Sequence, residues 1–170
     1  MVVVDSGLLV YLSRISQVQL LKALFGSVII SRSVYQETVV KGKALQKPGI
    51  STIEQAIEDG WIQVVETTPA EDELVKKLAV QESVEIEDAE VLFLAKKYGD
   101  GLVTNDGWLV KVAVSLGVDT YWTTTLVLLA VRKRVLSKAQ GRVILRKLVL
   151  SGMYLQTDVY EALLGALDSL

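Results

Sequence analysis

The sequence of 170 residues contains neither histidine nor cysteine. These absences exclude a Ser-His-Asp or Cys-His nucleophile, a histidine general base and a zinc site built from cysteine and histidine. A hydrolase of this composition must activate water with carboxylates, either directly or through a hard metal ion held by oxygen ligands. Disulfide bonds are excluded too, but a chain of this length can bury a sufficient core without them.

Long apolar runs are also missing. No stretch of about 18 apolar residues occurs without a charge, and the apolar start VVVDSGLLVYL is interrupted at Asp5 with no basic residue before it. A standard secretion signal would begin with a basic segment. We therefore expect no membrane-spanning segment or membrane contact and, from the lack of targeting signals, a cytoplasmic location.

Apolar residues nevertheless make up 51% of the chain, and the mean hydropathy is +0.39. These values are high for a soluble monomer, so either the interior is large or another subunit covers apolar surface. We expect an oligomer. The length is close to that of one compact domain, and we expect a single domain over residues 1–170.

Charge is distributed unevenly, although the net charge is only −2. Residues 51–90 hold twelve acids against two lysines, whereas residues 131–150 hold seven basic residues and no acid. The basic stretch is either a solvated helix face or a patch that contacts phosphates or an anionic partner.

Short apolar runs alternate with helical patterns along the chain. The runs predict buried strands at residues 2–4, 27–31, 62–66, 102–104 and 120–122. Such alternation predicts an α/β fold, a three-layer α/β/α sandwich on a parallel, five-stranded sheet. Residues 1–122 form this α/β core in our prediction, and residues 123–170 form a helical C-terminal extension.

Two helix starts have a clear signature. Thr68-Pro69-Ala70-Glu71 places a capping threonine before proline at the first helical position and glutamate at the third. Ser33-Val34-Tyr35-Gln36 fits a capping box at the start of the helix that follows the second strand. Residues 41–49 are expected to be a polar loop.

Four acidic residues are candidates for a metal site. Asp5 directly follows the first predicted strand, Asp106 follows the fourth by two residues, Glu37 lies one turn into a helix and Asp88 is near a helix start. Ligands of parallel α/β sheets bind at the carboxyl ends of the strands. Clustered carboxylates repel one another unless a divalent cation such as Mg²⁺ or Mn²⁺ compensates them. Helix capping is the alternative role for Asp88 and, to a lesser degree, Asp5, and Glu37 could be an ordinary exposed residue.

The same residues resemble the motifs of the PIN-domain family, which includes the VapC-type toxin ribonucleases. VVVDSGLLVYL resembles the opening strand with its aspartate, VIISRSVYQETV the second motif, IEDAEVLFLAKKYG the third and GLVTNDGWLVKVAVSLGV the fourth. No single motif is specific, but the four occur in order over residues 2–118. The tail is similar to a prokaryotic subfamily with a helical C-terminal extension.

The resemblance implies a ribonuclease that cleaves single-stranded RNA with a metal-activated water. Asp5, Glu37, Asp88 and Asp106 would hold one or two Mg²⁺ or Mn²⁺ ions. It also implies a homodimer and a small antitoxin protein that blocks the acidic pocket. The basic residues Arg132, Lys133 and Arg134 would be RNA phosphate contacts if they face that pocket.

One departure from the family pattern concerns the fourth motif, where Trp108 stands in place of a further aspartate. Candidate auxiliary groups are Ser6, Thr104 and Asn105, together with Glu90, which could assist or replace Asp88. Members of the subfamily with the helical extension usually have glycine near Thr123. Because of Trp108, the alternative hypothesis is a catalytically impaired PIN-like module that binds RNA or a protein partner.

Two other classes of protein are alternatives, but they fit the residues less well. A haloacid-dehalogenase-like phosphohydrolase needs a second aspartate two residues after the first, where this sequence has Gly7. A receiver domain needs a phosphoacceptor aspartate after its third strand, where this sequence has Glu66-Thr67-Thr68.

Overall fold

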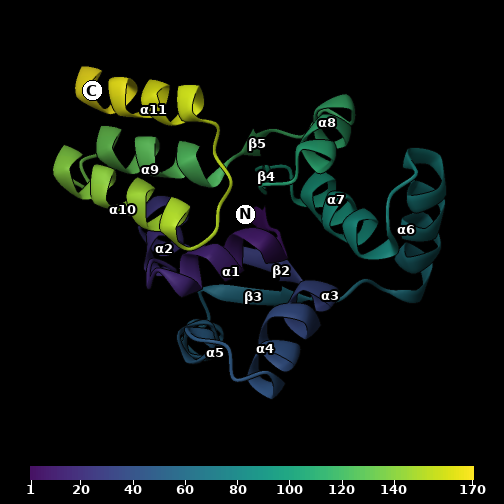
Figure 1. Cartoon of the computed structure of the whole chain (residues 1–170). Coiled ribbons are helices and arrows are strands. Elements are labelled where there is room, and N and C mark those ends of the chain that lie inside the picture. Colours follow the sequence, from purple (N-terminus) through teal and green to yellow (C-terminus); the bar gives the residue numbers. More distant parts are fainter.

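The computed structural model describes residues 1–170 and is built on one parallel sheet (Figure 1). The strand order is β3-β2-β1-β4-β5 and every neighbouring pair is parallel. The strands are β1 (Val2–Val4), β2 (Val28–Ser31), β3 (Ile62–Val65), β4 (Leu102–Val103) and β5 (Thr120–Tyr121). The predicted five-stranded parallel sheet is confirmed, and the carboxyl ends of β1, β2 and β4 lie side by side.

The central strands consist of β-branched and apolar residues because helices cover both faces of the sheet. All residues of β1, β2 and β4 are buried. Val3 of β1 aligns with Ile29 of β2 on one side and with Leu102 of β4 on the other. The backbone N–H of Asp5 continues this ladder by donating to the carbonyl oxygen of Val103 at 3.0 Å.

The helices that connect the parallel strands form the outer layers of the predicted sandwich. The helical segments of the α/β part are α1 (Ser6–Arg14), α2 (Gln19–Phe25), α3 (Arg32–Tyr35), the π-helical turn η1 (Gln36–Val40), α4 (Lys41–Ala44), α5 (Ile50–Glu58), α6 (Pro69–Glu82), α7 (Ile86–Tyr98) and α8 (Gly107–Ser115). Helix α7 packs against β1, β2 and β4 with α6 and α8 beside it, whereas α1 packs on α5, and α2 packs on β2.

The last part of the chain consists of α9 (Thr123–Arg132), α10 (Lys138–Leu150) and α11 (Thr157–Ser169). These helices pack on one another, and α9 also packs against α2. In Figure 1 they lie on the opposite side of the molecule from α6, α7 and α8. No single helix is long and apolar enough to cross a membrane; α1 and α2 pass that test only as a pair, with a bend of 118° between them.

The helix starts agree only in part with the sequence prediction. Thr68 and Glu71 form the predicted capping box of α6. The cap of α3 is Ser31, whose hydroxyl accepts from the N–H of Val34, so the prediction of Ser33 was wrong by two residues. Residues 41–49 are not all loop, because the helical segment after β2 continues through η1 to the end of α4.

Candidate functional site

Asp5 stands at the junction of β1 and α1, where it is half-buried. Its Oδ1 accepts a hydrogen bond of 2.7 Å from the N–H of Ser6, so the carboxylate caps α1. The Ser6 hydroxyl also approaches Oδ1, at 3.4 Å. Its Oδ2 accepts a bond of 2.9 Å from the hydroxyl of Thr104. Both carboxylate oxygens of Asp5 are therefore held in place from two different elements.

Thr104 connects two of the candidate acids. Its side chain is fully buried directly after β4, and its hydroxyl donates to Asp5 and accepts from the N–H of Asp106 at 3.1 Å. A threonine hydroxyl has one proton to donate and lone pairs to accept with, so both bonds can form together. The position of Asp5 is thus tied to the turn that carries Asp106.

Asp106 is exposed at the start of α8. Its Oδ1 accepts from the N–H groups of Trp108 at 2.8 Å and Leu109 at 2.9 Å. This residue is a helix cap, a role that leaves Oδ2 without a hydrogen-bond donor from the protein. A cap and a ligand role are compatible because each uses a different oxygen.

Asp88 lies half-buried in the first turn of α7. The cap position of this helix is Glu85, so the capping alternative does not describe Asp88. The pKa of Asp88 is raised from 3.8 to about 6 by burial first, then by the negative charges of Asp5 and Asp106, and then by Glu87 and Glu85. Its carboxylate therefore faces the same negative field as the strand-end aspartates.

Glu37 lies on η1 and is exposed. Its charge nevertheless acts on Asp5, whose pKa is raised mainly by burial and further by Glu37 and Asp106, against the lowering effect of the bonds from Thr104 and Ser6. A π-helical turn is uncommon and often occurs at functional sites. The fold thus brings all four candidate acids into one electrostatically coupled group.

The four acids have no cationic partner. None of the ion pairs of the protein includes Asp5, Glu37, Asp88 or Asp106. Hard oxygen donors with uncompensated charge suit Mg²⁺ or Mn²⁺ chemically. As the side chains stand, however, no three acidic groups are close enough to one another to hold a metal ion. The donor set fits a divalent cation by chemistry and charge, and the carboxylates must move toward one another to bind it.

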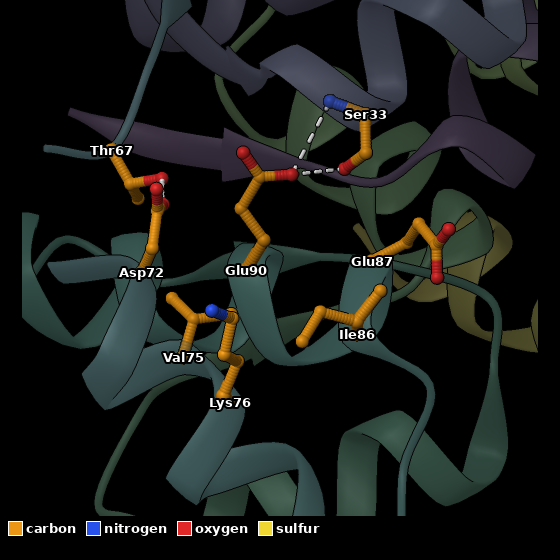
Figure 2. Close-up of a pocket in the computed structure, with 8 residues that line it drawn as sticks. All are labelled: Ser33, Thr67, Asp72, Val75, Lys76, Ile86, Glu87 and Glu90. Atoms are coloured by element: carbon orange, nitrogen blue, oxygen red, sulfur yellow. Dashed lines mark hydrogen bonds between the residues drawn. The ribbon is translucent and has the colours of Figure 1, made fainter. Parts of the chain in front are cut away.

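Glu90 lines a hollow between α6 and α7 and points toward Ser33 (Figure 2). Its Oε2 accepts hydrogen bonds from the N–H and hydroxyl of Ser33, at the start of the helical segment that carries Glu37. The hollow has a volume of about 250 Å³, and Glu87 also lines it. Ser33 was not among the predicted site residues. The hydrogen bonds between Glu90 and Ser33 therefore connect α7 to α3.

Asn105 makes all its side-chain hydrogen bonds with one residue, Thr123. Its Oδ1 accepts from the N–H of Thr123 at 3.1 Å and from the hydroxyl at 2.9 Å, and its Nδ2 lies 2.6 Å from the same hydroxyl oxygen. Thr123 is fully buried. These hydrogen bonds join the end of β4 to the start of α9. The sequence did not predict that Thr123 would hold the side chain of Asn105.

The predicted phosphate contacts are not brought together with the acids. Lys133 lines a hollow with Met1 and Asp100, at the amino ends of the strands. Arg132 and Arg134 line another hollow, beside the C-terminal residue Leu170. Helix α9 begins after β5 at the carboxyl edge of the sheet and runs back to the opposite end, so Arg132 and the two basic residues that follow the helix lie away from Asp5.

The chain matches one family profile over nearly its whole length. A family profile described as a PIN domain matches residues 1–169. The crystal structure of PAE2754 from Pyrobaculum aerophilum is similar at 19% identity and a TM-score of 0.49, over 68% of this chain and 96% of that one. A comparison with curated proteins gave no match.

The chain belongs to the PIN-domain family, as its match over residues 1–169 shows. PIN domains are generally nucleases, and such nucleases generally use divalent metal ions.

Proposed function

We propose that this PIN-domain protein is an endoribonuclease that cleaves single-stranded RNA with a water activated by Mg²⁺ or Mn²⁺. The proposal is carried by one observation: the negative charges of Glu37 and Asp106 act on Asp5, those of Asp5 and Asp106 act on Asp88, and no ion pair compensates any of the four acids. A protein without histidine has few other means of activating water for phosphodiester hydrolysis.

The four acids would hold the metal, which would supply a hydroxide at neutral pH and stabilise the charge that develops on the phosphate. The chain itself prepares this site. Thr104 orients Asp5 through Oδ2, and Asp106 keeps an oxygen free while its other oxygen caps α8. Glu87 and Glu85 add negative charge around Asp88.

The family resemblance also suggests a biological setting. We propose that the protein forms a homodimer and acts as the toxin of a toxin–antitoxin pair, with a small protein that blocks the acidic group. Exposed apolar side chains on α6 and α10, such as Val80 and Val143, are consistent with contacts to another chain. Light scattering of the purified protein tests the dimer.

A second candidate function is a PIN-like module that binds RNA or a protein without cleaving. The exposed Trp108 in the fourth motif favours it. It is also favoured by the spacing of the acids, because no three of their side chains are close enough to one another to hold a metal ion. Such a module would bind RNA equally well with and without divalent ions.

RNA cleavage by the wild type and two matched variants separates the candidates. Asp5→Asn removes a charge of the acidic group, and Asp119→Asn makes the same change at an exposed residue just before β5, at the other end of the sheet. With Mn²⁺ or Mg²⁺, we expect cleavage of labelled single-stranded RNA by the wild type and Asp119→Asn, and a loss of roughly 100-fold or more in Asp5→Asn. Equal activity in all three, or none in any, contradicts the enzyme proposal.

A further inference from the structure

Two exposed tryptophans stand at the carboxyl edge of the sheet. Trp108 is 55% exposed in the first turn of α8, which follows β4, and Trp122 is 38% exposed between β5 and α9. The third tryptophan, Trp61, is 4% exposed and belongs to the core. Two of the three largest side chains of the protein are therefore presented to solvent at the end of the sheet where the acids lie.

The Trp122 indole lies beside Gly107, the residue that precedes Trp108. Strands β4 and β5 are paired in parallel, so the residues that follow them leave the same edge of the sheet. A Cβ atom placed on Gly107 would lie 3.8 Å from Cη2 of Trp122. Gly107 stands between Asp106 and Trp108, so the Trp122 ring reaches the residue that joins the candidate metal ligand to the other indole.

The backbone around both rings is well fixed. The N–H of Trp108 donates to Asp106 at 2.8 Å, and the residue after Trp122, Thr123, is held by its hydrogen bonds with Asn105. Rings on an ordered backbone lose little conformational freedom on binding, which favours recognition of a flat partner.

Charge alone does not explain how a nucleic acid would be held here. The edge is acidic, and the basic residues Arg132, Lys133 and Arg134 lie toward the other end of the sheet or the C-terminus. Stacking of bases on indoles does not depend on positive charge and is a common means of holding single strands.

We propose that Trp108 and Trp122 form a stacking platform for unpaired bases of the RNA whose phosphodiester backbone lies at Asp5 and Asp106. This inference rests on the proposed function, in which single-stranded RNA is the substrate. It assigns the preference for single strands to these two rings: bases within a duplex are stacked on one another and cannot lie on an indole. Because every base has a flat face, the platform selects strandedness more strongly than base identity.

The test measures binding in the presence of Mg²⁺ to a fluorescein-labelled 2′-O-methyl phosphorothioate oligouridine, which resists hydrolysis. We expect Trp108→Ala and Trp122→Ala each to weaken binding by at least about fivefold. Trp108→Phe and Trp122→Phe, which keep a flat ring, should retain most of the affinity. The matched control is Tyr154→Ala, because Tyr154 is 83% exposed before α11 and should bind like the wild type.

Quenching of tryptophan fluorescence gives an independent readout in unmodified protein. The oligouridine should quench the wild type and leave only the Trp61 signal unchanged. Wild-type affinity in both alanine variants overturns the platform. An equal loss of affinity in the phenylalanine variants also overturns it, as does a smaller particle size of either alanine variant in light scattering, which would assign the rings to a protein interface. Binding and quenching without RNA cleavage by the wild type would reject the nuclease proposal alone.

Discussion

The hydroxyl of Thr104 donates a hydrogen bond of 2.9 Å to Oδ2 of Asp5, a residue 99 positions earlier in the sequence. The bond connects the ends of two neighbouring parallel strands, β1 and β4. It also favours the charged form of a carboxylate whose pKa is raised by burial. A single buried hydroxyl thus orients the first acid of the group and favours its charged form, while a lone pair of the same oxygen accepts from the N–H of Asp106.

The first prediction concerns Thr104→Val, which removes this donor at nearly constant volume. The pKa of Asp5 should rise further, because the bond that lowers it is lost. The acidic limb of the cleavage pH profile should then move to higher pH, and the free energy of unfolding should fall by about 1 kcal/mol. Carbon-13 NMR titration of the aspartates measures the pKa directly. Thr104→Ser, which keeps the hydroxyl, should restore the wild-type value; an unchanged Asp5 titration in Thr104→Val would show that the bond does not act on it.

A second prediction uses the pKa of Asp88, which is about 6 in the folded protein against an ordinary value of 3.8. Between these values Asp88 binds more protons in the folded state than in the unfolded state, so its contribution to the stability of the metal-free protein should fall as pH rises from about 4 to about 6. Because Asp88 is half-exposed to screening solvent, its share is on the order of 1 kcal/mol.

Asp88→Asn should lose this dependence and become more stable than the wild type at neutral pH. Urea unfolding with EDTA at several pH values measures it. The control is Asp119→Asn, whose stability curve should run parallel to that of the wild type. A parallel curve for Asp88→Asn as well would contradict the assignment.

The third prediction concerns metal binding. At pH 7.5, Mn²⁺ or Mg²⁺ should raise the melting temperature, because an ion that binds only the folded state stabilises it by mass action. The shift should be smaller at pH 5, where Asp88 is largely protonated, and should be abolished in Asp5→Asn/Asp88→Asn. Differential scanning fluorimetry measures it. A shift of the same size in the double variant would place the ion elsewhere.

The fourth prediction separates Asn105 from the metal chemistry. Its side chain is fully used by Thr123, so Asn105→Ala should lower stability by roughly 1–3 kcal/mol. A double-mutant cycle with Thr123→Val should show coupling, since the hydroxyl contacts require both residues. The metal-induced shift in melting temperature should persist in Asn105→Ala. Its loss would mean that Asn105 acts in the acidic group itself.

The fold could be predicted because each strand is a short run of apolar residues bounded by turn residues. The strand-end acids followed from the sheet, since Asp5 comes directly after β1 and Asp106 stands in the turn after β4. The start of the helix after β2 was less predictable, because Ser31 and Ser33 both have the chemistry of a cap. Ser33 instead contacts Glu90, a partner 57 residues away that local pattern does not reveal.

Other features of the site depend on how helices and strands are oriented relative to one another, which no short stretch of sequence specifies. The basic residues at the end of α9 lie far from the acids because this helix runs back toward the amino ends of the strands. The proximity of Trp122 to Gly107 depends on the parallel pairing of β4 and β5. Neither relationship can be recognised from the spacing of residues in the sequence.

The most direct test of the central claim is the anomalous scattering of Mn²⁺ in crystals of the wild type soaked near pH 7.5. The account predicts a peak bounded by carboxylate oxygens of Asp5, Asp88 and Asp106, close to Glu37, at metal–oxygen distances of about 2.0–2.4 Å. The peak should be absent from Asp5→Asn crystals. A wild-type crystal without a peak at these residues, or with manganese bound only elsewhere, would contradict the account.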